Sequence, residues 1–151
     1  MLTRALFRTV ACLALVASAA PAYAQSGGVR AGASVNPDQF YFGGHLETDA
    51  LVDRLHLRPN VEVGVGDDVT TVAVNLEVVY KVPLRKTPWT FYGGGGPAIN
   101  YYNRDERGSN TEGGMTLLAG LEHAEGLFLE VKVGAWDSPD LKFGIGYVFG
   151  R

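Results

Sequence analysis

The sequence predicts an all-β protein, an eight-stranded antiparallel up-and-down transmembrane β-barrel. Two observations carry this prediction. Large apolar residues alternate with small or polar residues along eight segments, and no apolar period of 3.6 residues is sustained. Short turns rich in Gly, Pro, Asn and Asp separate the segments, so consecutive strands form hairpins. The expected strands are Val29–Val35, Phe40–Thr48, Leu55–Gly66, Val69–Val82, Trp89–Tyr101, Thr111–Glu122, Leu127–Trp136 and Leu141–Phe149.

The first four expected strands each keep one apolar face and end at a turn signal. Val29–Val35 carries Val and Ala at its odd positions and stops at the turn Asn36-Pro37-Asp38. Phe40–Thr48 then places Phe40, Phe42 and Leu46 on one face. Leu55–Gly66 is apolar at its odd positions apart from Pro59, and Gly66-Asp67-Asp68 predicts a tight hairpin into Val69–Val82.

The next three expected strands follow the same rule. Trp89–Tyr101 keeps its large apolar residues in phase around four consecutive glycines, Gly93–Gly96, which indicate curvature and room for opposing side chains. The longest expected loop is Tyr102–Asn110. Thr111–Glu122 has Met115, Leu117, Ala119 and Leu121 in phase. Leu127–Trp136 sets Leu127, Leu129, Val131 and Val133 opposite Phe128, Glu130, Lys132 and Trp136.

The closing segment shows the alternation most clearly, since its odd positions are Leu141, Phe143, Ile145, Tyr147 and Phe149. It resembles the closing strand of small bacterial outer-membrane β-barrels of the opacity-protein and OmpA-like type, which alternates in the same way and finishes with an aromatic residue. The resemblance implies an integral outer-membrane protein of a Gram-negative bacterium with a structural or surface-interaction role. It also implies that the barrel-assembly machinery recognises this strand during biogenesis.

Aromatic residues favour an apolar face that contacts lipid. With both termini in the periplasm, these residues fall at two levels, where amphipathic rings favour the interface between membrane and water. The expected girdle is Tyr80, Trp89, Phe91, Tyr147 and Phe149 near the periplasmic ends, and Phe40 and Tyr101 near the outer ends. The alternative is a soluble periplasmic lipocalin-like barrel, whose apolar face would enclose an apolar ligand.

The opposite face carries charges of both signs, which a membrane barrel would hold in its lumen. Five acids against five bases predict an internal network of ion pairs that fills the lumen. The alternative is a narrow porin-like channel, although a selective pore favours rings of one sign. The expected network consists of Arg30, His45, Glu47, His56, Arg58, Glu62, Glu77, Lys81, Glu122, Glu130, Lys132 and Lys142.

The N-terminal segment predicts export. Arg4 and Arg8 precede the apolar run Val10–Ala20, and Ala22-Tyr23-Ala24 has the form of a cleavage site. We therefore expect a signal peptide over residues 1–24 and an outer-membrane barrel domain over residues 25–151. Without Arg4 and Arg8 the chain has 11 basic and 16 acidic residues, a net charge of −5, which argues against a nucleic-acid partner.

Catalytic, metal and cofactor sites are not expected. Some small outer-membrane barrels modify lipid A, and the deacylases among them use a His-x-Ser pair, but the three histidines here read His45-Leu46-Glu47, His56-Leu57-Arg58 and His123-Ala124-Glu125. The expected mature chain has no cysteine, and its histidines are too scattered for a metal site. The sequence thus predicts a monomer in lipid that is not an enzyme.

Two prolines conflict with a regular barrel. Pro59 and Pro97 fall inside expected strands, and a closed barrel has no free edge at which a missing N–H donor is harmless. Each is expected to lie at a bulge or to shorten its strand.

Overall fold

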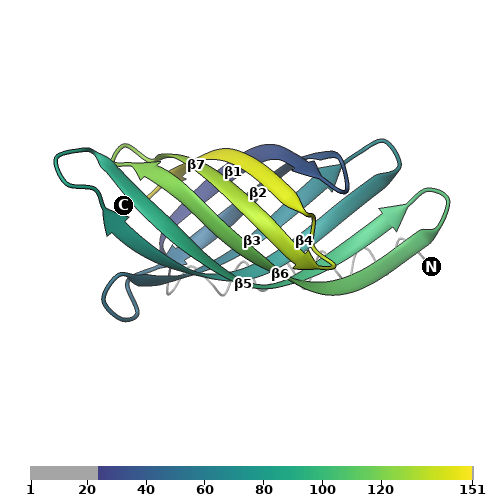
Figure 1. The fold of residues 1–151 in the computed structure, drawn as a ribbon, viewed down its shortest axis with the longest axis horizontal. Helices are drawn as coiled ribbons and strands as arrows, with labels where there is room; N and C mark the ends of the chain where they lie inside the picture. The colour runs from purple at the N-terminus through teal and green to yellow at the C-terminus, as the bar shows by residue number, and fades with distance from the viewer. Residues whose placement is uncertain (1–23, 151) are drawn as a thin grey trace.

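The computed structural model describes residues 24–150, and these residues form a closed antiparallel barrel (Figure 1). Each strand pairs with its neighbours in sequence, and the last strand closes on the first, which confirms the predicted fold class. The expected signal peptide lies outside the described residues except for Ala24. The strands are β1 (Ala24–Val35), β2 (Gln39–Thr48), β3 (Leu55–Val65), β4 (Val69–Pro83), β5 (Trp89–Arg104), β6 (Gly108–His123), β7 (Leu127–Trp136) and β8 (Leu141–Phe149).

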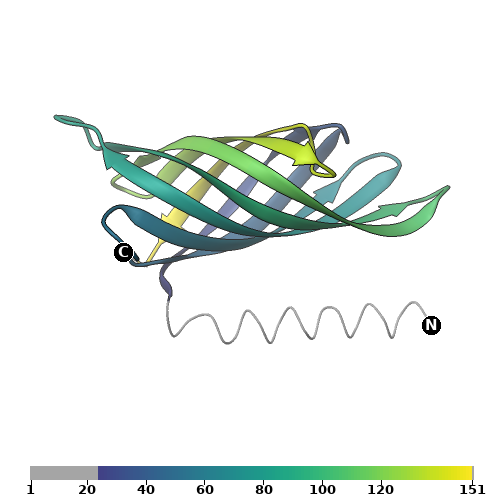
Figure 2. The ribbon, with the colours of Figure 1, turned by 60° about the horizontal axis from the view of Figure 1, so that its bottom comes forward.

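The strands tilt strongly against the barrel axis (Figures 1 and 2). The end at which β1 begins and β8 finishes is called the terminus end below, and the opposite end is called the far end. In the part of the chain that the structure describes, no helix has the length and hydropathy to cross a membrane.

The far rim is oblique because neighbouring strands differ in length. The pairing of β5 with β6 continues to Arg104↔Gly108, whereas that of β6 with β7 stops at Gly114↔Trp136. At the far end, the β5–β6 hairpin therefore extends well beyond the neighbouring β7–β8 turn (Figure 2). The predicted loop Tyr102–Asn110 is wrong, since most of it is strand. Gly108 closes the tight turn with a φ of 75°, a conformation that glycine adopts without strain.

Neither proline forms a bulge or shortens its strand. The β4–β5 pairing passes from Asn75↔Ala98 to Val78↔Gly95 with the register unchanged, so the ladder only skips the pairs around Pro97. On the other side of β4, Pro59 lies opposite Leu76, and the β2–β3 ladder stops at His45↔Asn60. The structure accommodates both missing donors by leaving out ladder bonds, and the expectation of bulges or shorter strands was wrong.

Glycines inside the barrel make room for large side chains on the adjacent strand. A Cβ at Gly146 would meet the Phe128 ring, and a Cβ at Gly120 would meet the Tyr92 ring. Phe128 lies directly opposite Gly146 in the β7–β8 register. The lumen is packed by this pairing of large residues with glycine, as expected for an eight-stranded barrel.

Replacing Gly146 by alanine is expected to destabilise the barrel by about 1–3 kcal/mol, because the added methyl group would lie 2.6 Å from Phe128 Cε1 and close to the Val29 carbonyl oxygen. Unfolding in urea, followed by the loss of the compact band on gels, measures this change. Gly93→Ala is the matched control, since its Cβ would meet nothing nearer than 3.7 Å. Equal stability of the two variants would contradict the packing described here.

Candidate functional site

The barrel has an inside-out distribution of residues. Its outer surface exposes Leu, Val, Ile and Phe along every strand, as at Leu117, which is 64% exposed. Its interior buries the charged residues, including Glu77, which is fully buried. A soluble barrel shows the reverse, and lipid on the outside explains this distribution.

The expected aromatic girdle lies on the outer surface at two levels. Six of its seven members are exposed, and Phe40 is the most exposed at 79%. Trp89 is half-buried, because its ring packs edge-on against His123 with the centroids 4.8 Å apart. Trp136, expected to point inward, is instead 76% exposed at the far end. Its φ of 58° breaks the alternation at the last residue of β7 and accounts for this correction.

The lumen network begins near the terminus end with Glu47. Arg58 donates to Glu47 Oε2 from both Nε (2.9 Å) and Nη2 (2.7 Å), and Lys81 pairs with the other oxygen of this carboxylate. Lys81 Nζ also lies 3.2 Å from Glu122 Oε2. His56 Nδ1 is 3.8 Å from Glu47 and 2.9 Å from the Thr48 carbonyl oxygen.

Glu130 connects this group to the middle of the barrel. Its carboxylate accepts hydrogen bonds from Arg30 (2.7 Å), Arg58 (3.2 Å) and the Tyr92 hydroxyl (2.9 Å). The Arg58 guanidinium also lies 4.7 Å from the centroid of the Tyr92 ring. Arg30 Nη2 is 3.0 Å from His45 Nδ1, which brings this histidine into the same network. Four strands thus meet at one buried carboxylate.

The network continues toward the far end through Glu62. Lys132 Nζ lies 2.9 Å from Glu62 Oε1 and 2.5 Å from Glu77 Oε1, while Lys142 Nζ lies 2.5 Å from Glu62 Oε2. Arg30 Nη1 approaches Glu62 at 3.4 Å and joins the two halves. The structure therefore brings the twelve residues singled out in the sequence into one continuous network.

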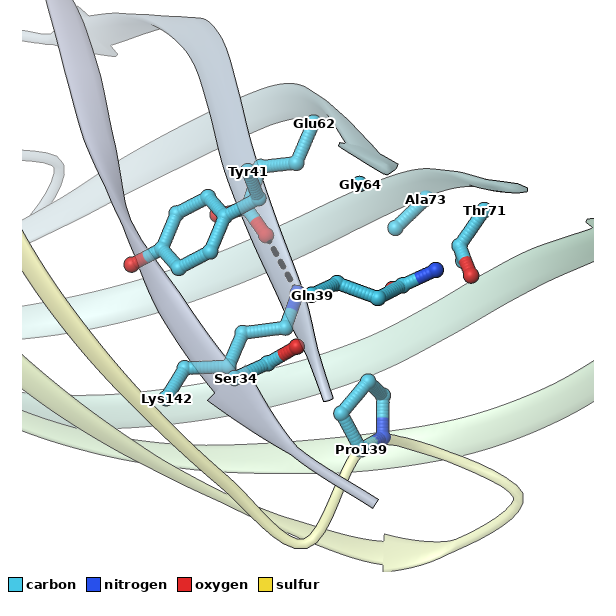
Figure 3. Close-up of a pocket in the computed structure, with 9 residues that line it drawn as sticks. All are labelled: Ser34, Gln39, Tyr41, Glu62, Gly64, Thr71, Ala73, Pro139 and Lys142. Atoms are coloured by element: carbon cyan, nitrogen blue, oxygen red, sulfur yellow. Dashed lines mark hydrogen bonds and ion pairs between the residues drawn. The ribbon is translucent and has the colours of Figure 1, made fainter. Parts of the chain in front are cut away.

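Paired charges and aromatic rings close the lumen. Within residues 24–150, the five acids and five bases of the lumen are each held by an opposite charge and form no ring of one sign. A small pocket lies at the far end, and the Lys142–Glu62 ion pair forms part of its lining (Figure 3). Its lining residues are Ser34, Gln39, Tyr41, Glu62, Gly64, Thr71, Ala73, Pro139 and Lys142.

Three aromatic residues also belong to the lumen, although none of them is among the twelve residues expected in the network. Tyr92 donates to Glu130, the Phe128 ring lies 5.6 Å from the Arg30 guanidinium, and Tyr41 lies under Lys142 at 5.1 Å. The alternation of the strand does indicate such rings: Phe128 lies two residues from Glu130 and four from Lys132, so it shares their face.

The three histidines have no serine partner within residues 24–150. His45 contacts Arg30, His56 contacts the Thr48 carbonyl, and His123 Nδ1 accepts from the Glu125 amide. Ser34 and Ser138 are held elsewhere, at the Pro37 carbonyl and at Asn100. In the same part of the chain, no group of three or more His, Cys, Asp or Glu side chains is placed to hold a metal ion.

Solved structures of outer-membrane barrels resemble this fold. The N-terminal barrel of Pseudomonas aeruginosa OprF has 18% identity and a TM-score of 0.60, covering 84% of this chain and 99% of its own. Neisserial surface protein A has 15% identity and a TM-score of 0.62, covering 85% of this chain and 96% of its own. The outer-membrane enzyme PagL has 14% identity and a TM-score of 0.55, covering 83% of this chain and 99% of its own. No family model and no curated protein sequence matches the chain.

Proposed function

We propose that residues 25–151 form an integral outer-membrane β-barrel with a structural role in the envelope, and that residues 1–24 direct its export. The observation that carries this proposal is the inversion of the two faces, with an apolar surface outside and an ion-paired network inside. Lipid is the environment in which such an outer surface is stable. The likeness in fold to OprF and neisserial surface protein A supports the same assignment.

The proposed role is structural because the lumen holds a network that stabilises the barrel. The turns at the far end are short, and the β5–β6 hairpin is the part that extends farthest there (Figure 2). A surface-interaction role would therefore fall on this hairpin. We propose further that the barrel is a monomer and that the assembly machinery recognises β8.

The proposal extends to the absence of enzymatic activity. PagL is an outer-membrane enzyme with a similar fold, so the fold itself permits catalysis. Within residues 24–150, however, the hydroxyls of Ser34 and Ser138 have no histidine beside them to act as a base. His45 is held by Arg30 inside the ion-pair network.

Fractionation and gel mobility test the proposal. The full chain is expressed in a Gram-negative host, outer membranes are isolated, and samples are run on SDS gels with and without boiling. A membrane band whose mobility changes on boiling is the expected result. A periplasmic protein without such a shift would contradict the proposal and would favour the soluble lipocalin-like alternative.

Planar bilayers should show no steady conductance when the folded protein is inserted, because paired side chains fill the lumen. The heat-modifiable band of the same preparation serves as the control for insertion. A steady current that changes on Glu77→Gln would contradict the sealed lumen and would favour the porin-like alternative, since Glu77 lies within the network.

A further inference from the structure

Basic residues outside the lumen are unevenly placed. In the described chain, Arg104 and Arg107 belong to the β5–β6 hairpin at the far end. The remaining three, Arg54, Arg85 and Lys86, lie on two turns at the terminus end, and all three are exposed. None of these three forms an ion pair with another residue of the range 24–150. The Lys81 amide donates to the Arg54 carbonyl (3.0 Å), so the two turns lie side by side.

The β4–β5 turn, residues 83–88, is held by hydrogen bonds and carries two exposed bases, Arg85 and Lys86. The Leu84 amide donates to the Trp89 carbonyl (3.0 Å), and Thr87 Oγ1 donates to the Leu84 carbonyl (3.3 Å), which fixes the turn. It reads Pro-Leu-Arg-Lys-Thr-Pro and contains no acid. The neighbouring β2–β3 connector carries Asp49 and Asp53 beside Arg54. The excess of positive charge therefore lies at Arg85 and Lys86.

On the lipid-facing surface next to this turn, aromatic side chains come first, and a residue without a side chain follows farther along β5. Phe91 lies opposite Val82 in the β4–β5 register, and Tyr80 lies opposite Gly93. Farther along β5, Gly93 and Gly95 lie on the outward face, and the Leu117 side chain covers part of Gly95, since a Cβ there would meet Leu117 Cδ2 at 3.0 Å. A Cβ at Gly93 would meet no atom nearer than 3.7 Å, so internal packing does not require glycine there. At Gly93, beside the cationic turn, an acyl chain can therefore lie directly against the backbone.

The turns at the far end carry the opposite charge, so the exposed cationic turn is specific to the terminus end. Eight carboxylates lie on the far-end turns and hairpins, against Arg104 and Arg107 alone. An anionic ligand is repelled there. The eight are Asp38, Asp67, Asp68, Asp105, Glu106, Glu112, Asp137 and Asp140. In the described chain the terminus-end turns carry Arg54, Arg85 and Lys86 against Asp49, Asp53 and Glu125, so the positive excess at this end is local to the β4–β5 turn.

We propose that the β4–β5 turn binds an anionic phospholipid of the periplasmic leaflet. Arg85 and Lys86 bind the phosphate, with Arg54 at the side. Arg makes bidentate hydrogen bonds to phosphate oxygens, and Lys acts as a compact charge. Tyr80 and Phe91 flank the glycerol region, where aromatic rings favour the interface. One acyl chain runs across the open backbone at Gly93. This inference rests on the proposed function, because it requires the barrel to lie in a membrane.

Native mass spectrometry of the folded full chain tests the inference. The protein is placed in nanodiscs of mixed phosphatidylglycerol and phosphatidylethanolamine, released in the gas phase, and the retained lipids are counted. The wild type is expected to retain phosphatidylglycerol preferentially. The double variant Arg85→Gln/Lys86→Gln is expected to lose about tenfold of this preference, since each basic side chain attracts anionic headgroups. The matched control, Arg104→Gln/Arg107→Gln, removes two cations from the far end and should retain the wild-type preference.

The outcomes separate the two proposals. A chain that does not enter nanodiscs contradicts the proposed function itself. A chain that enters them but retains both lipids equally overturns only the lipid site. Gly93→Leu covers the open backbone at this residue without changing any charge, and it should weaken lipid retention. If the wild type gives a dimer that Gly93→Leu abolishes and the charge variant keeps, this surface binds a second copy and the lipid proposal is overturned.

Discussion

Replacing Leu117 by arginine is expected to destabilise the folded barrel in lipid by about 2–4 kcal/mol. Leu117 lies near the middle of β6 with its side chain on the outer surface, 64% exposed. In a soluble protein an exposed leucine exchanges for arginine at little cost. At the midplane of a bilayer the same exchange places a charge in hydrocarbon. Urea titration of the protein in lipid vesicles measures the difference.

Thr111→Arg is the matched control because Thr111 lies on the same strand and the same face. It pairs with Tyr101, a member of the expected far-end girdle, so we expect it at the membrane interface. The cost of arginine near the interface is about 0–1 kcal/mol. If both variants keep the stability of the wild type, the outer surface does not contact lipid.

Replacing Glu130 by leucine is expected to cost about 3–5 kcal/mol, the usual effect of removing one partner of a buried ion pair. Glu130 holds Arg30 and Arg58, and neither guanidinium has access to water that would compensate for the loss. The Tyr92 hydroxyl loses its acceptor at the same time. The variant should unfold at lower urea concentration than the wild type in the same vesicles.

Glu125→Leu is the control for this change. Glu125 lies in the exposed β6–β7 turn, and its carboxylate is 3.7 Å from the ring of His123, so its removal should alter the free energy of unfolding by no more than about 0.5 kcal/mol. A Glu130→Leu variant as stable as Glu125→Leu would show that the lumen network adds nothing to stability.

Much of the fold follows from the alternation of residues in the sequence. Because successive side chains point to opposite faces, the phase of Leu141, Phe143 and Ile145 assigns every residue of β8 to a face. The same rule groups the charged residues of several strands, and pairing brings them together once the barrel closes. Which acid meets which base did not follow from the sequence, since the partners of Glu130 lie on β1, β3 and β5.

The alternation of apolar and polar residues predicts nothing where both faces of a strand are exposed to the same solvent. Residues 105–111, at the tip of the β5–β6 hairpin, are exposed on both sides of the ribbon, so their polar composition suggested a loop. Trp136 departs from its phase because of a positive φ, which no pattern of hydropathy encodes. The two prolines flank Leu76 on neighbouring strands, and this arrangement depends on the register of three strands at once.

Site-directed spin labelling of β6 tests the central claim, that the apolar face contacts lipid and the charged face is sealed inside. Single cysteines at residues 115–122 carry a nitroxide in vesicles, and its collisions with lipid-soluble oxygen and with a water-soluble nickel complex are measured. The predicted result is high oxygen accessibility at Met115, Leu117, Ala119 and Leu121 and low accessibility to both reagents at the residues between them. High nickel accessibility at Leu117 and Ala119 would contradict the account, because water and not lipid would then contact the apolar face.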